Sequence, residues 1–283
     1  MDFFVGVIEG SDGDASFFIN AWAYASHPGE AVHKMLGAAR RNAINGPILV
    51  NLDYADHDEP PEGAVPVPEA DAYLEDTEYS FPTELSYQMP HGVIPTGEQS
   101  EIDIDDIRPG WETWESESGL IHIEAVVEEA QLLGIYLSLV AVIPEIRAFS
   151  VKLAEDWEEV ESSEIYYNEE LNSVSLIESF LTERRNDTLL NGHLSLMTYS
   201  DEGQTNLNIS DHKMIHLMTY EKEIAVEVRK ILHQNNVPEN EELLSIANGV
   251  HHLHYRHPDG LGRSDLIRML LDTGFYKWDV EVT

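Results

Sequence analysis

The stretch LSLMTYSDEGQTNLNISDHKMIHLMTYEKEIAVEVRKILH, residues 194–233, decides the fold class of this chain. Residues 194–199, 205–209 and 214–219 have the composition of successive strands, and the turn signal Ser200-Asp-Glu-Gly203 joins the first two. Short turns between consecutive strands make them antiparallel. Residues 221–233 then place apolar side chains on one face of a helix. We therefore predict an antiparallel sheet covered by helices, an α+β fold.

The same C-terminal module is predicted to contain further elements on both sides of this stretch. We expect helices over 120–133, 171–185 and 264–271, and a strand over the apolar run 135–143. The helix over 221–233 begins with acidic residues and ends with basic ones, which the helix dipole favours. We assign residues 119–283 to one larger C-terminal α+β domain with an antiparallel sheet and helices.

The N-terminal residues predict a small ββαβ unit. Strands are expected over 3–9, 17–24 and 48–54, and Pro28 suits the first position of a helix. Residues 73–79 are expected to add one more strand, so that the N-terminal unit spans residues 1–84. One face of the helix is apolar and consists of Val32, Met35, Leu36, Ala39 and Ala43.

The residues between these two units change in character. Eight of the 13 prolines lie within residues 59–118, and no Lys or Arg occurs between Arg41 and Arg108. Proline and acidic residues with few long apolar runs are typical of connections between domains. We therefore predict an acidic, proline-rich linker over 85–118.

Composition excludes several classes of function. The chain has 283 residues, 53 Asp and Glu, 16 Lys and Arg, and a net charge of -37. Nucleic acids and anionic membranes are polyanions, so such a chain is not expected to bind either. Cysteine is absent, which excludes disulfides and thiolate chemistry. No apolar run is long enough for a membrane span and no signal peptide is recognisable, so we expect a cytoplasmic protein.

The acidic residues are concentrated in the middle of the chain. Residues 51–170 contain 31 acids and three bases, a net charge of -28. Aromatic residues ringed by charges are typical of interface hot spots, so we expect a surface that binds a basic protein. Two alternatives stay open: the acids maintain solubility only, and each Trp covers a local core. The expected partner-binding residues are Asp103, Asp105, Asp106, Trp111, Glu112, Trp114, Glu115, Glu117, Glu155, Asp156, Trp157, Glu158 and Glu159.

No catalytic motif and no complete metal site is recognisable. The run from His251 to His257 contains four imidazoles, and His252 with His254 would share one face of a strand. His212 and His216 form a second pair, but neither pair has a third ligand at a suitable spacing. We therefore expect no catalytic residues, no metal and no other cofactor. A metal-dependent hydrolase using residues 251–257 stays as an alternative, beside a regulatory interaction module.

The chain resembles, in overall style, the immunity proteins of bacterial polymorphic-toxin systems. The resemblance rests on the small acidic α+β unit, the acidic centre, and the run Leu207-Asn-Ile-Ser-Asp-His-Lys-Met-Ile-His-Leu-Met-Thr-Tyr220 before an amphipathic helix. It implies a cytoplasmic, non-catalytic protein that neutralises the toxin domain of a secreted protein. It assigns no role to any single residue.

Overall fold

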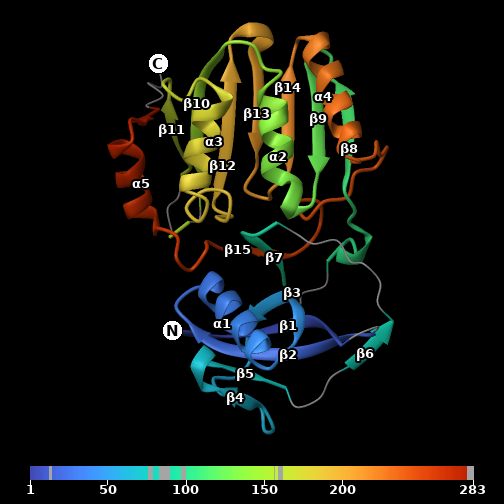
Figure 1. Ribbon diagram of the computed structural model, residues 1–283, viewed down its shortest axis with the longest axis vertical. Coiled ribbons are helices and arrows are strands. Elements are labelled where there is room, and N and C mark those ends of the chain that lie inside the picture. The colour runs from blue at the N-terminus through green and yellow to red at the C-terminus, as the bar shows by residue number, and fades with distance from the viewer. Residues whose placement is uncertain are drawn as a thin grey trace.

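The computed structural model describes residues 1–12, 15–75, 79–82, 90–96, 100–155, 157–158 and 162–278. These residues form an α+β fold with antiparallel sheets, as the sequence predicts. An N-terminal module lies at one end of the molecule and a larger C-terminal module at the other (Figure 1). A small two-stranded sheet lies between them.

The N-terminal module is built on a long hairpin and has the predicted ββαβ order. Its elements are β1 (Asp2–Asp12), β2 (Ala15–Ala25), α1 (Pro28–Arg41), β3 (Asn45–Tyr54), β4 (Val65–Val67), β5 (Ala72–Leu74) and β6 (Tyr79–Pro82). The strand order is β3-β1-β2-β5-β4, with β6 also paired to β2. Helix α1 buries Val32, Met35 and Ala39 in a core that includes Phe4 and Leu52. The added strand predicted over 73–79 is shorter and begins one residue earlier, as β5.

The first turn of α1 contains a charged group that stabilises the folded state. The hydroxyl and backbone N–H of Ser26 donate to Glu30 at 2.6 and 2.7 Å, and the Lys34 ammonium lies 3.0 Å from the same carboxylate. These contacts lower the pKa of Glu30 to about 2. A carboxyl group with a depressed pKa in the folded state stabilises the protein above its unfolded pKa.

We expect the substitution Glu30→Gln to lower the free energy of unfolding at pH 7 by roughly 1–2 kcal/mol, because an amide cannot replace the charge. The native protein should lose this stabilisation as the pH falls through the range from about 4.5 to 2. The variant should lack that part of the pH dependence. Urea unfolding at pH 7 and pH 3 measures both, with Glu69→Gln, at an exposed position of the same module, as the control. Equal losses of stability on acidification in native protein and variant would contradict this assignment.

The C-terminal module contains an antiparallel sheet in the order β16-β11-β10-β12-β13-β14-β9-β8. The strands are β8 (Gly110–Glu115), β9 (Ile121–Val126), β10 (Ile146–Leu153), β11 (Glu164–Asn168), β12 (Leu194–Ser200), β13 (Thr205–Ile209), β14 (Ile215–Thr219) and β16 (Tyr276–Lys277). The helices are α2 (Glu129–Val140), α3 (Val174–Glu183), α4 (Lys222–Gln234) and α5 (Arg263–Asp272). In Figure 1, α2, α3 and α4 lie over one face of this sheet.

The order of helix and strand predicted over 120–143 is wrong. Residues 121–126 form β9, in which apolar and polar residues alternate, and the helix begins only at Glu129. The run 135–143, predicted as a strand, lies largely within α2. This helix packs on the sheet and is flanked by α3 and α4, so it is apolar on more than one face. A short, continuously apolar run does not distinguish a strand from a buried helix.

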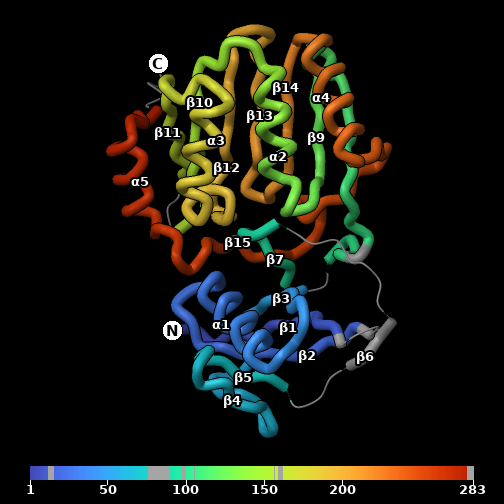
Figure 2. The backbone as a smooth tube through the Cα atoms, viewed as in Figure 1, coloured from blue at the N-terminus to red at the C-terminus, as the bar shows by residue number. Residues whose placement is uncertain are grey.

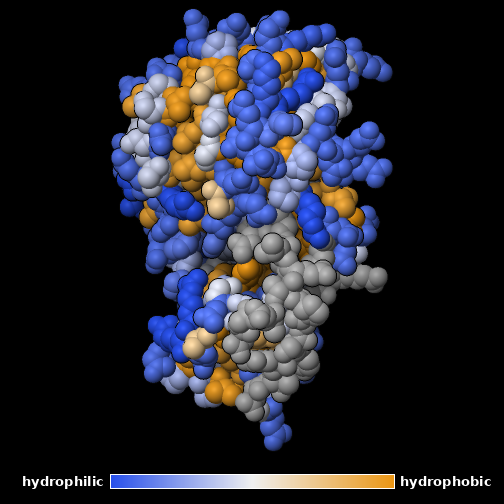
Figure 3. Space-filling model, turned by 45° about the vertical axis from the view of Figure 1, so that its right-hand side comes forward, coloured by the Kyte–Doolittle hydropathy of each residue, from blue (hydrophilic) through white to orange (hydrophobic). Residues whose placement is uncertain are grey.

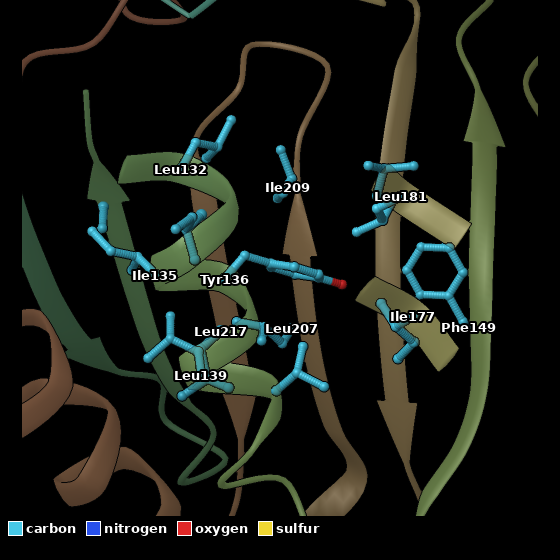
Figure 4. Packing of buried hydrophobic residues seen from close by; sticks show 14 of the residues in the cluster. Leu132, Ile135, Tyr136, Leu139, Phe149, Ile177, Leu181, Leu207, Ile209 and Leu217 are labelled. Atoms are coloured by element: carbon cyan, nitrogen blue, oxygen red, sulfur yellow. The ribbon is translucent and has the colours of Figure 1, made fainter. Parts of the chain in front are cut away.

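The core of the C-terminal module lies between the helices and the sheet. Figure 4 shows the Tyr136 ring extending from α2 into a layer of aliphatic side chains from the helices and strands. The Tyr136 side chain is fully buried, and its hydroxyl lies 2.8 Å from the Thr198 hydroxyl on β12. Burial raises the pKa of Tyr136, because the phenolate would be charged in an apolar core. The hydroxyl pair satisfies two polar groups that are far from solvent.

The segment predicted as a linker is partly built into the fold. Residues 110–115 form β8, and Val93–Pro95 form β7, which pairs with β15 (His252–His254). Ile107, between them, is 1% exposed. The linker prediction is therefore wrong for these residues, because strand pairing and a small apolar cluster fix them in place. The predicted boundary at residue 84 lies outside the described residues.

Residues 250–257 pass between the two modules, as Figure 2 shows. The Tyr255 N–H donates to the Gly92 carbonyl, and the Gly192 N–H donates to the Tyr255 carbonyl. Tyr255 also contributes to the core of the N-terminal module. On its other side, Arg256 forms a bridge with Asn191 of the C-terminal module. This segment therefore connects the packing of the two modules.

Figure 3 shows hydrophilic side chains over much of the visible surface, with apolar patches among them. Among the residues that the structure describes, no helix has both the length and the apolar character to cross a membrane.

Candidate functional site

The acidic residues predicted to bind one partner lie in two separate places. Those of residues 101–117 lie at or near β8, at one end of the large sheet, whereas Glu155 and Glu158 lie in the connection between β10 and β11. Five strand spacings separate β8 from β10, a distance of about 24 Å across the sheet. Asp156, Glu159 and the side chain of Asp105 lie outside the described residues. The two stretches predicted to bind a partner therefore do not lie side by side on the sheet.

Two of the three tryptophans predicted to bind a partner are core residues. Trp111 is 5% exposed and Trp157 is 3% exposed, and both belong to the core of the C-terminal module. Trp157 stacks on the His193 ring, with centroids 5.1 Å apart. The alternative that each Trp covers a local core therefore holds at these two positions. Neither side chain is available to a partner.

Trp114 is the tryptophan of the acidic stretches that reaches solvent. It is 42% exposed and stacks on His122 of β9, with ring centroids 4.9 Å apart and planes inclined by 4°. Stacking fixes the orientation of the indole ring and leaves its other face open. Beside it, an acidic groove of about 460 Å³ runs between β8 and the chain at residues 239–241. The groove is lined by Glu112, Thr113, Trp114, Glu239, Asn240 and Glu241.

We call the exposed surface around this groove the acidic edge. It comprises Glu112, Trp114, Glu115, Glu117, Glu239 and Glu241. Glu112 lies directly opposite Glu124 of β9, and its carboxylate accepts a hydrogen bond from the Leu243 N–H at 3.3 Å. A hydrogen bond from His216 on β14 lowers the pKa of Glu124 although partial burial opposes this. The carboxylates of Glu112 and Glu124 therefore lie on neighbouring strands at this edge of the sheet.

The second acidic stretch has a local structural role. The Glu158 carboxylate accepts a hydrogen bond from the Arg263 N–H at 3.0 Å, at the first residue of α5. An acidic side chain at this position satisfies a free N–H and interacts favourably with the helix dipole. The helix predicted over 264–271 begins one residue earlier, at Arg263, and its N-cap is Gly262.

The structure brings three histidines together that the sequence separates. His252 and His254 lie on β15, and His212 lies in the turn between β13 and β14. Nε2 of His252 is 3.1 Å from Nε2 of His212 and 3.2 Å from Nε2 of His254. One ligand atom from each of the three rings lies within 4.8 Å of the others. The sequence argument against a metal rested on a missing third ligand, and His212 removes that argument.

His212 could not be recognised as the third ligand from spacing alone. It is 40 residues from His252, and its sequence partner by helical spacing, His216, lies on β14 and contacts Glu124 instead. One feature of the sequence does point to His212: it lies directly between two predicted strands. A turn at that position projects its side chains from one end of the sheet. Asp259, which follows the histidine run in sequence, lies beside His257 rather than in this cluster.

The groups around the three histidines are mostly held in their neutral form. Burial lowers the pKa of His254 to about 4 and that of His193 to about 3. Burial likewise lowers the pKa of Lys213 to about 7, and Nζ of this side chain donates to the Asn191 carbonyl at 2.6 Å. Burial alone would raise the pKa of Asp211, but its hydrogen bond with His212 outweighs this and lowers it.

Comparison with known protein families, curated proteins and solved structures finds no match to this chain.

Proposed function

We propose that this chain is a non-catalytic, cytoplasmic binding protein that captures a basic partner at the acidic edge. The partner proposed is the toxin domain of a secreted bacterial protein, so that the chain acts as its immunity protein. The observation that carries the proposal is an exposed, stacked tryptophan among carboxylates on the outermost strand of a sheet. Aromatic side chains that combine apolar area with a fixed orientation are frequent binding hot spots.

The backbone of β8 supports this proposal. The Trp111 N–H donates outward to the Pro238 carbonyl, and the Trp111 carbonyl accepts from the Asn240 N–H. Because backbone groups alternate in direction along a strand, Thr113 has its N–H and carbonyl on the same outer side. Among the described residues, no named strand pairs with β8 on this side. An extended segment of a partner could therefore add to the sheet beyond Trp111.

The charge of the edge selects among such segments. Carboxylates beside an open strand repel acidic partners and attract Lys and Arg side chains. A neutral partner would bury them unpaired, which costs free energy. The net charge of -37 extends this attraction beyond the contact itself. A basic extended segment therefore fits both the backbone and the side chains of the acidic edge.

The test uses the C-terminal domain of a secreted protein encoded beside this chain's gene. We expect the amide variant Glu115→Gln, Glu117→Gln, Glu239→Gln, Glu241→Gln to associate roughly tenfold more slowly at low salt, since it loses long-range attraction. Trp114→Ala should instead raise the dissociation rate about thirtyfold, which corresponds to about 2 kcal/mol. Surface plasmon resonance at two ionic strengths separates the two effects.

A charge-matched control removes four exposed carboxylates elsewhere, by the substitutions Glu62→Gln, Glu155→Gln, Glu170→Gln and Glu178→Gln. This control should associate faster than the edge variant, because net charge is equal and only position differs. Equal association rates of the two variants would show that the edge is not the contact. Lack of binding by any neighbouring basic toxin domain would contradict the immunity role itself.

A further inference from the structure

The three histidines approach one another from two parts of the fold. The Ser210 N–H donates to the Met214 carbonyl, which closes the turn that carries His212. His252 and His254 are two residues apart on β15, so their side chains leave the strand on the same face. The pairing of β15 with β7 fixes that strand at the junction of the two modules.

Each ring is oriented by a second contact at its other nitrogen. Nδ1 of His212 lies 3.0 Å from a carboxylate oxygen of Asp211, and Nδ1 of His252 lies 2.6 Å from the Val250 carbonyl. Nδ1 of His254 lies 2.5 Å from the Gly192 carbonyl. These oxygens can only accept hydrogen bonds, so each Nδ1 carries the hydrogen. In a neutral imidazole the hydrogen at Nδ1 leaves Nε2 with a lone pair.

When all three rings are neutral, three Nε2 lone pairs lie in one small region. With no hydrogen between them, nitrogen atoms 3.1 and 3.2 Å apart repel one another. The three second contacts nevertheless hold the rings in this arrangement. A cation between the nitrogens turns this repulsion into three favourable bonds. Metal-binding histidines usually donate their other ring N–H to a carboxylate or a backbone carbonyl, and all three rings here do so.

The spacing fits zinc. Zn–N bonds of about 2.0–2.1 Å in a tetrahedron place neighbouring ligand nitrogens about 3.3–3.4 Å apart. The separations of His252 from His212 and from His254 are within a few tenths of an ångström of that value, and all three ligand atoms lie within 4.8 Å of one another. Imidazole ligands suit zinc, and three of them leave a fourth position for water or another ligand. We propose that His212, His252 and His254 form a zinc(II) site at the junction of the two modules.

This site would link distant parts of the chain. His212 belongs to the large sheet, whereas His252 and His254 lie on the strand that packs between the modules. Bound zinc would fix that strand to the turn between β13 and β14. It would stabilise the folded protein, since a metal that binds only the folded state adds its binding free energy to folding.

The experiment uses full-length protein without a histidine tag, stripped with a chelator and then titrated with zinc chloride alone. We expect about one zinc per chain by calorimetry and elemental analysis, and a rise in Tm of roughly 5 °C at a hundredfold excess of zinc over Kd. His212→Ala and His252→Ala should each abolish the tight site and the rise in Tm. His251→Ala, which changes an exposed histidine next to the site, should retain both.

A milder variant keeps the test decisive if an alanine variant does not fold. Asp211→Ala removes the contact to Nδ1 of His212 but leaves all three ligands, so its zinc affinity should fall about 10- to 100-fold with an unchanged stoichiometry. No tight zinc binding by the native protein would overturn the proposal. Equal binding by the native, His212→Ala and His252→Ala proteins would also overturn it, because the metal would then lie elsewhere. None of these changes alters the acidic edge, so the two proposals succeed or fail separately.

Discussion

The substitution Tyr136→Ala is expected to lower the free energy of unfolding by about 3–5 kcal/mol, because it removes an aromatic ring from the centre of the larger core. The side chain is fully buried between α2 and the sheet, where neighbouring helices and strands limit how far the structure can relax (Figure 4). The cavity left by the ring should therefore stay largely open. The atoms that line it lose their van der Waals contacts, which lowers the free energy of unfolding. Urea unfolding of the full chain measures the change.

The conservative variant separates packing from hydrogen bonding. Tyr136→Phe keeps the ring and leaves the Thr198 hydroxyl without its partner at 2.8 Å, so it should cost about 1–2 kcal/mol. Thr198→Val should cost a similar amount. The double variant should cost less than the sum of the two, because the second change leaves no further polar group unsatisfied. Strict additivity would show that the two hydroxyls do not interact in the folded protein.

The regular parts of this fold could be predicted because local pattern and tertiary environment agree there. The hairpins over 194–219 and the amphipathic helix α4 each have one buried face and one solvent face, so a single period is visible in their sequences. Helix α2 lacks this contrast, because its flanks are covered by other helices. For β8, the acidic side chains suggested a solvated linker. Pairing with β9 across the short turn at residues 116–120 makes this stretch one strand of a local hairpin, which its acidic composition concealed.

In the candidate sites, too, local sequence identified some residues, whereas others depend on tertiary contacts. Local sequence identified the acidic stretches and the pair His252 and His254, which are neighbours on the chain. It could not show that Trp111 points into the core while Trp114, three residues later, points to solvent. That distinction depends on which face of β8 the helices cover. His212 likewise becomes a neighbour of the pair only through the pairing of β15 with β7 and the docking of the two modules.

The substitution Gly29→Ala is expected to cause the second large loss of stability, because it disturbs a contact between the two modules. Replacing a helical glycine with alanine ordinarily stabilises a protein by about 0.4–1 kcal/mol. At Gly29, however, the new Cβ atom would lie 1.9 Å from the Arg256 carbonyl oxygen, on the segment between the modules. Neither backbone can accommodate that contact, so α1 must move away from residues 250–257. We expect a loss of about 3 kcal/mol, since overpacking of a backbone contact exceeds a typical core insertion.

Gly134→Ala is the matched control. Gly134 also lies in a helix, and a Cβ atom there would meet no other atom within 4 Å, so this variant should be as stable as the native protein or more stable. Hydrogen exchange would locate the loss in Gly29→Ala at residues 250–257 and at the start of α1, because these are the backbones that must separate. A Gly29→Ala protein as stable as Gly134→Ala would mean that α1 does not pack on this segment. The contact between the modules would then rest on other residues, such as Tyr255 and Ile94 in the N-terminal core.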